Sequence, residues 1–316
     1  MKTTQATGSP IETVRIIRLH DGRLLAYGEH GDPAGKPVIL FHGTPGSRLF
    51  CHPDESIAAS LNARIITIDR PGFGLSDFKP GRTLLDWPDD VVELADALQI
   101  DRFGVVGVSG GGSYVAACAL KIPHRLATVA MISSIAPFDA PEATKGMGWP
   151  YQLLFSLARN SHTLAKLSWW LMNLTYRQNT KRFFDFEASL SPESDKALLK
   201  EPDIRAIVMQ DYAEAIRAGA RGTTWEMMLL ARPWGFRLED ITVDVYLWHG
   251  EKDVRTPLTM GKYLASAIPN CHATFLPGEG HHMFYRHWGK ILSILLSQSR
   301  LQRARQWRRV HSLASV

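Results

Sequence analysis

Short, uninterrupted apolar runs recur along the first half of the chain and again near its end. They lie at 37–41, 63–68, 103–108, 127–132, 243–248 and 271–276. Continuous apolar runs of this length are typical of parallel strands that are covered on both faces. Two more short strands are predicted at 14–19 and 23–29, joined by a turn at Asp21-Gly22. The pattern therefore predicts a mostly parallel sheet with one hairpin at its start.

Helical patterns separate these apolar runs. Residues 83–99 repeat apolar positions at helical spacing, and a helix of small residues is expected from Gly110 to Ile122, before Pro123. A last helix carries Trp288 and several aliphatic side chains on one face. Strands that alternate with helices indicate an α/β fold, and the crossovers between parallel strands should be right-handed.

The middle of the chain departs from this alternation. Residues 137–235 hold helical patterns, at 149–159, 164–176, from Ser191 and at 204–218, and no convincing strand. We therefore expect an all-helical cap inserted into the sheet domain. The expected division is a first core part at 1–136, the cap at 137–235, a second core part at 236–299 and a basic tail at 300–316.

Composition excludes several protein classes. The chain has 316 residues, of which 45% are hydrophobic and 21% charged, so it is neither disordered nor of low complexity. It contains no apolar run long enough for a membrane-spanning helix and no signal-peptide pattern at its start. The 3 cysteines are widely spaced, which argues against a disulfide framework or a zinc site, so a cytoplasmic location is expected.

The net charge of +5 comes from the tail. Residues 300–316 contain five arginines and no acid, so the rest of the chain carries equal numbers of basic and acidic residues. No nucleic-acid-binding surface is therefore expected on the body. The tail is most simply a solvated end; a weak contact with an anionic surface is the second interpretation.

The strongest chemical signal is Gly107-Val108-Ser109-Gly110-Gly111, which matches G-x-S-x-G. An apolar strand precedes it and a small-residue helix follows, as a nucleophile elbow requires. In that turn a serine hydroxyl is exposed beside the N-terminus of a helix, where negative charge is favoured. Ser109 is therefore the predicted nucleophile.

A serine nucleophile needs a base and an acid that orients the base, in the order Ser, Asp, His for this elbow. Asp253 and His281 each lie in a loop after a predicted strand, so both reach the same edge of the sheet. Glu251 is the weaker alternative for the acid. His282 is the alternative base, although it is better placed to begin the last helix. The other histidines that follow strands, His42 and His249, are assigned structural roles.

The reaction also needs two donors for an oxyanion. The backbone N–H of Gly110, directly after the nucleophile, is one, and the loop His42-Gly43-Thr44-Pro45-Gly46 should supply the other. Because Pro45 has no N–H, Thr44 is the predicted donor.

The segments HGTPG, DRPGFGLSD, GVSGGG, HGEKD and GEGHH, in this order, resemble the α/β-hydrolase superfamily over roughly residues 14–298. HGTPG is similar to the HGxP loop of epoxide hydrolases and haloalkane dehalogenases, but those enzymes place an aspartate at the position of Ser109, which argues against both activities. HGTPG also resembles the HGGPG loop of proline iminopeptidases. The residues that follow the fourth strand of this chain differ from the pattern of that family, which argues against aminopeptidase activity.

The resemblance implies the α/β-hydrolase fold with a cap, and a carboxylesterase-like serine hydrolase that needs no cofactor and no metal. The expected substrate is a small-to-medium apolar ester. Amide, thioester, lactone and C–C hydrolysis and cofactor-free perhydrolase chemistry remain alternatives on the same residues. A ligand-binding sensor with little turnover is the alternative from another class.

The predicted cap holds five of the nine tryptophans and five of the nine methionines. Such side chains either form the core of the cap or line an adaptable apolar pocket. Trp169, Trp170 and Trp225 are the candidate substrate contacts, under a roof that is expected to hold little fixed charge.

Overall fold

The computed structural model describes residues 14–313, with the side chains of residue 177 and residues 299–313 outside that description. Its centre is a sheet in the order β1-β2-β4-β3-β5-β6-β7-β8. β2 pairs antiparallel with β1 and β4, and the other neighbouring pairs are parallel. The strands are β1 (Arg15–Arg18), β2 (Leu24–Gly31), β3 (Lys36–Phe41), β4 (Ala63–Ile68), β5 (Phe103–Val108), β6 (Leu126–Ile132), β7 (Val245–Gly250) and β8 (Cys271–Leu276). The predicted mostly parallel sheet is confirmed.

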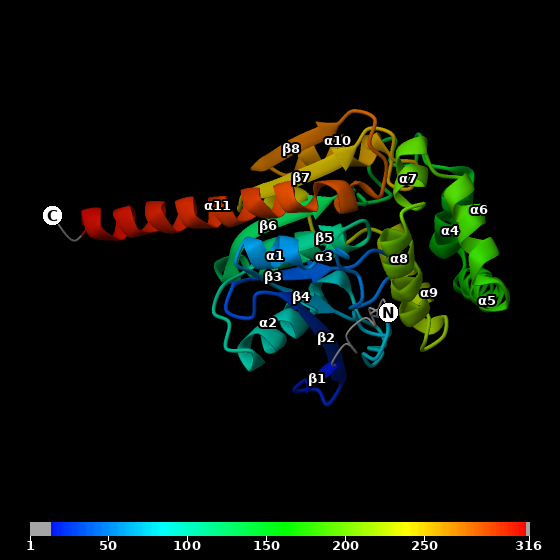
Figure 1. The fold of residues 1–316 in the computed structure, drawn as a ribbon, viewed down its shortest axis with the longest axis horizontal. Coiled ribbons are helices and arrows are strands. Elements are labelled where there is room, and N and C mark those ends of the chain that lie inside the picture. The colour runs from blue at the N-terminus through cyan, green and yellow to red at the C-terminus, as the bar shows by residue number, and fades with distance from the viewer. Residues whose placement is uncertain (1–13, 314–316) are drawn as a thin grey trace, which may run out of the picture.

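Helices cover both faces of the sheet (Figure 1). One face packs against α2 (Trp87–Ala97), α3 (Gly111–Lys121) and α10 (Leu258–Ala267). The other face packs against α1 (Ser56–Ser60) and the first part of α11 (Met283–Leu313). β5 is buried along its whole length, as the continuous apolar run predicts for a central strand.

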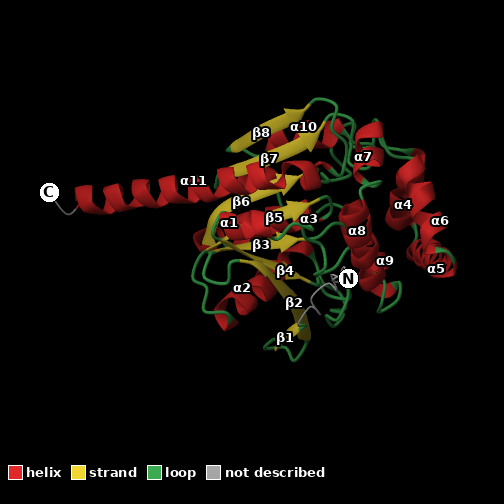
Figure 2. Cartoon of the chain, viewed as in Figure 1, coloured by secondary structure: helices red, strands yellow, loops and turns green. Residues whose placement is uncertain are grey.

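Six α-helices lie between β6 and β7, and we call them the cap helices. They are α4 (Trp149–Asn160), α5 (His162–Gln178), α6 (Thr180–Ser189), α7 (Glu193–Leu198), α8 (Pro202–Ala215) and α9 (Arg221–Ala231). α6 and α9 were not predicted from the sequence pattern. The arrows of the parallel strands β3–β8 point towards the cap helices, so the cap lies over the carboxyl edge of these strands (Figure 2).

The last helix is longer than the core needs. α11 continues to Leu313, and its end extends away from the body on the side opposite the cap helices (Figure 1). The predicted tail contact involves side chains outside the described residues. No helix among the described residues is long and apolar enough to cross a membrane.

Candidate active site

Ser109 lies in the sharp turn between β5 and α3. Its φ is +57°, a left-handed conformation that costs energy for a residue with a side chain. The turn is held by hydrogen bonds from Ser109 N–H to Ile132 O at 3.0 Å and from Ile135 N–H to Ser109 O at 3.2 Å. A Cβ on Gly107 would come within 2.4 Å of Gly111 O, so this turn requires glycine at that position.

Asp253 and His281 form a hydrogen-bonded pair. Asp253 Oδ2 lies 2.8 Å from His281 Nδ1. Asp253 Oδ1 accepts the backbone N–H groups of Arg255 at 2.8 Å and Thr256 at 2.9 Å. Burial opposes the charge of Asp253, but attraction to His281 and the hydrogen bonds outweigh it and lower its pKa to about 2. Asp253 is therefore ionised at neutral pH and fixes the orientation of the imidazole.

The structure separates these residues from the alternatives. Glu251 is exposed, whereas Asp253 is buried beneath His281. His282 is half-buried, and desolvation of its ring together with the charge of Arg255 keeps its pKa well below the usual range. His42 makes a hydrogen bond to Gly43 O at 2.7 Å and His249 to Thr256 O at 2.7 Å, contacts that fix the surrounding loops.

Ser109 and His281 line the same cavity, together with Gly43, Thr44 and Pro45 from the loop after β3. The described contacts include no direct hydrogen bond between the Ser109 and His281 side chains. In enzymes without substrate this contact is often long and tightens on binding. The N–H groups of Thr44 and Gly110 donate to no other described group, and a Cβ on Gly110 would come within 2.3 Å of Thr44 Oγ1. The two residues that carry these donors are therefore in close contact.

The loop that carries Thr44 is fixed by a buried ionic cluster that the sequence reasoning missed. Glu226 on α9 accepts hydrogen bonds from Thr44 Oγ1 at 2.6 Å, Arg70 Nη2 at 2.6 Å and Arg82 Nη2 at 3.0 Å. Tyr114 Oη also donates to Glu226, at 2.8 Å. Burial alone would raise the pKa of Glu226, but the two guanidinium groups hold it well below its usual range.

The loop that carries His281 is fixed by another cap residue that the sequence reasoning missed. Asp195 on α7 accepts the backbone N–H of His281 at 2.8 Å and that of His282 at 2.9 Å. A Cβ on Gly280 would come within 2.4 Å of the Asp195 carboxylate, so glycine allows this approach. No short motif marks Asp195 or Glu226, because their partners are distant in sequence.

The cavity has a volume of about 140 Å³, enough for a benzene-sized group. Trp169 lines it and is 3% exposed. Trp170 and Trp225 lie elsewhere and line a separate surface hollow with Phe78 and Leu167. Their position does not support the prediction that they contact substrate.

The expectation of a roof with little fixed charge is wrong. Arg255 and Glu187 both line the cavity and form an ion pair at 3.1 Å. Asp211 also lines it, and burial raises the pKa of this carboxyl to about 7. The wall is therefore a mixture of apolar and polar groups.

The model of the α/β hydrolase fold family matches residues 36–287. The chain belongs to the α/β-hydrolase superfamily. Its relatives include pimeloyl-[acyl-carrier protein] methyl ester esterase from Legionella pneumophila, which is 24% identical over 84% of this chain and 95% of the relative. A second is 3-oxoadipate enol-lactonase 1 from Acinetobacter baylyi, which is 24% identical over 82% of this chain and 87% of the relative.

Among solved structures, an esterase from Exiguobacterium antarcticum superposes with a TM-score of 0.66 at 19% identity, covering 90% of this chain and 98% of that one. This likeness concerns the fold. Together, the family match and the hydrolase relatives support a general hydrolase activity for this superfamily member.

Proposed function

We propose that the protein is a carboxylesterase-like serine hydrolase that cleaves a small-to-medium ester, or a related acyl bond, through an acyl-enzyme intermediate. The observation that carries the proposal is the placement of Ser109, in a strained turn, on the same cavity as the hydrogen-bonded pair His281–Asp253. A serine hydroxyl alone is a weak nucleophile, and this arrangement supplies both the base and the group that orients it.

In the proposed reaction, Ser109 Oγ attacks the acyl carbon while His281 takes its proton. Asp253 holds the imidazole in the required tautomer and stabilises its charged form. The N–H groups of Thr44 and Gly110 stabilise the negative oxygen of the tetrahedral intermediate. His281 then protonates the leaving alcohol, and a water molecule, activated by the same base, releases the acyl group. The free donors beside Ser109 support this assignment.

A fluorophosphonate probe tests the proposal directly, because it reacts rapidly only with an activated serine. Intact mass should show one adduct, and peptide mapping should locate it at Ser109. Ser109→Ala should lose the adduct and reduce kcat for p-nitrophenyl esters by about 10³-fold or more. Labelling of a different serine, or a folded protein that reacts with neither probe nor esters, contradicts the proposal. Ser266→Ala is the control, since Ser266 lies on α10, does not line the cavity and donates its hydroxyl to Tyr263 O at 2.9 Å.

A further inference from the structure

Several buried polar atoms on residues that line the Ser109 cavity have no hydrogen-bond partner among the described residues. They are the hydroxyls of Tyr151, Tyr212 and Tyr285, the indole N–H of Trp169, Nε2 of His282 and Nε of Arg255. Tyr212 is 8% exposed, Tyr285 5% and Trp169 3%. Each unpaired buried polar group costs about 1–3 kcal/mol, and native proteins keep few of them. Their collection around one cavity indicates a ligand that pairs with them.

The charges on the wall limit what that ligand can be. Arg255 is paired with Glu187 through one guanidinium nitrogen, so its charge is balanced within the wall, and the described lining holds no other arginine or lysine for a carboxylate or phosphate. Oδ1 of the Asp211 carboxyl accepts two hydrogen bonds from Ser47, one from the backbone N–H at 2.6 Å and one from the side-chain hydroxyl at 2.8 Å. Tyrosine hydroxyls both donate and accept, so they suit uncharged oxygen groups.

We propose that the cavity recognises substrates that carry a neutral oxygen function, such as a ketone, ether or hydroxyl group, within a few bonds of the scissile bond. The inference rests on the proposed ester hydrolysis and narrows its substrate class. A site built to hydrogen-bond an oxygen rejects the matching alkyl compound, because its own polar groups then stay unpaired.

The test uses esters that match in shape and differ in one oxygen. One pair has the oxygen in the acyl group, p-nitrophenyl 4-oxopentanoate against 4-methylpentanoate. The other has it in the alcohol, 4-oxopentyl acetate against 4-methylpentyl acetate. In at least one pair, kcat/KM for the oxo ester should be about tenfold higher than that for the methyl-substituted ester of the same pair. The ratio is first divided by the ratio of the rates at which hydroxide alone hydrolyses the two esters. Equal or reversed values in both pairs overturn the inference. Absence of turnover and of probe labelling at Ser109 would instead contradict the proposed function.

Two variants separate substrate recognition from a structural role. Tyr212→Phe and Tyr285→Phe should reduce the preference for the oxo ester, while Tm stays unchanged or rises, because a hydroxyl without a partner is removed. Tyr176→Phe is the matched control: Tyr176 is also a buried tyrosine of the cap, but its hydroxyl donates to Met209 O at 3.1 Å and it does not line the cavity. Tyr176→Phe should keep the preference for the oxo ester and should lower Tm. A preference that survives in both cavity variants overturns the assignment.

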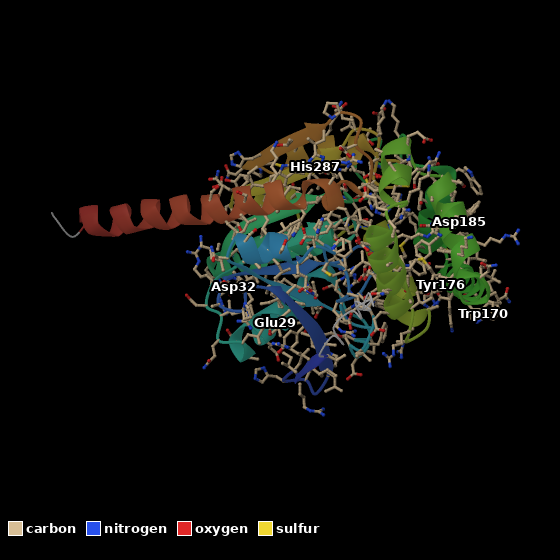
Figure 3. All side chains as sticks on the ribbon, viewed as in Figure 1. Glu29, Asp32, Trp170, Tyr176, Asp185 and His287 are labelled. Atoms are coloured by element: carbon tan, nitrogen blue, oxygen red, sulfur yellow. The ribbon has the colours of Figure 1, made fainter. Side chains whose placement is uncertain are left out.

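An independent observation concerns the outer surface of the cap. Trp149 and Leu153 on α4 are 68% and 50% exposed, and Phe186 on α6 is 55% exposed. On α5, Trp170 is 54% exposed, and Leu164, Leu167, Leu171 and Leu174 are 40–49% exposed. We call these eight residues the outer apolar face. Trp170 lies at the outer edge of the cap helices, away from the sheet (Figure 3). So many large apolar side chains in one region mark an interaction surface.

The charge around the outer apolar face identifies its partner. Residues 149–186, which span the outer apolar face, contain five basic residues and one acidic residue, Asp185, which pairs with Arg205 at 2.9 Å. Of the basic ones, Arg159, Lys166, Lys181 and Arg182 are exposed. Exposed tryptophan and leucine rimmed by lysine and arginine are the features of helices that lie in the interface of an anionic membrane.

We propose that the cap docks on anionic lipid bilayers through the outer apolar face. The full chain should sediment with vesicles of phosphatidylcholine and phosphatidylglycerol, and less with phosphatidylcholine alone or at high salt. Brominated lipid should quench the fluorescence of Trp149 and Trp170, so quenching should decrease in a W149F/W170F variant. Binding should be lost in L167S/L171S and weakened in K166E/R182E. Ile16→Ser is the control, because Ile16 is 47% exposed on β1, outside the cap.

Two outcomes overturn this second proposal. One is vesicle binding that disappears on deletion of residues 300–316 but persists in L167S/L171S. Because α11 extends away on the side opposite the cap, that result would place the lipid contact on the tail and not on the outer apolar face (Figure 1). The other is a concentration-dependent dimer that L167S/L171S abolishes, without vesicle binding by the parent chain. That result would assign the outer apolar face to a second copy.

Discussion

Glu226 on α9 accepts a hydrogen bond from Thr44 Oγ1 at 2.6 Å, and so joins the cap to the loop after β3. The same carboxylate pairs with Arg70 and Arg82, and the side chains of Glu226 and Arg70 are 0% exposed. One cap residue therefore forms ion pairs with two buried cations and fixes the loop that supplies a proposed oxyanion donor. In this protein the cap is part of the support of the site as well as its cover.

The first prediction concerns that cluster. Glu226→Gln leaves two buried guanidinium groups with no compensating charge, so it should reduce the free energy of unfolding by about 3–5 kcal/mol. Urea unfolding measures the change. Glu214→Gln is the matched control: Glu214 pairs with Arg48 at 2.6 Å but is 13% exposed, so its loss should be clearly smaller. Equal decreases in the free energy of unfolding in the two variants would show that burial does not make the Glu226 pairs more important for stability than the Glu214 pair.

The second prediction concerns the two adjacent histidines. His281→Ala should abolish ester turnover, because the imidazole hydrogen-bonded to Asp253 is the proposed base. His282→Ala should retain much of kcat, since no described hydrogen bond joins His282 to Asp253. Steady-state kinetics on one ester decide the question. If His282→Ala is the inactive variant and His281→Ala the active one, the assignment of the base is wrong.

The sequence allowed the prediction of Ser109, Asp253 and His281 because each follows a strand of one parallel sheet. Strand order then brings their loops to one edge, whatever the detailed packing. The cap tryptophans show the opposite case. Trp169 and Trp170 are adjacent, yet 3% and 54% exposed, because the face that a helix buries depends on its neighbours. Asp195 and Glu226 were missed for a related reason: each acts on a loop far away in the sequence.

The third prediction concerns the contact between α7 and the His281 loop. Asp195→Ala removes the acceptor of two backbone N–H groups, the buried one of His281 and the partly buried one of His282. We expect kcat to fall by about tenfold or more, with a small change in KM, because the base loses its position rather than its chemistry. Asp195→Asn should recover part of kcat, since its one carbonyl oxygen can accept from one of the two donors. A normal kcat in Asp195→Ala would show that the loop is held by other contacts.

The last prediction is a pH dependence that originates at Asp211. Burial raises the pKa of this carboxyl to about 7, an effect that the nearby Asp69 increases and that Ser47 and Arg70 oppose. Its pKa in the unfolded chain is about 3.9. The folded state thus keeps a proton that the unfolded state loses, so this contribution to stability is fully present below about pH 4 and is lost as the pH rises towards 7.

Asp211→Asn cannot titrate, and relative to the parent chain it should gain on the order of 3 kcal/mol of unfolding free energy between pH 4 and pH 8. Urea unfolding at several pH values measures this difference, and Asp203→Asn, an exposed residue on the same helix, is the control. A parallel pH dependence in the parent chain and Asp211→Asn would mean that Asp211 is already ionised in the folded protein at pH 4.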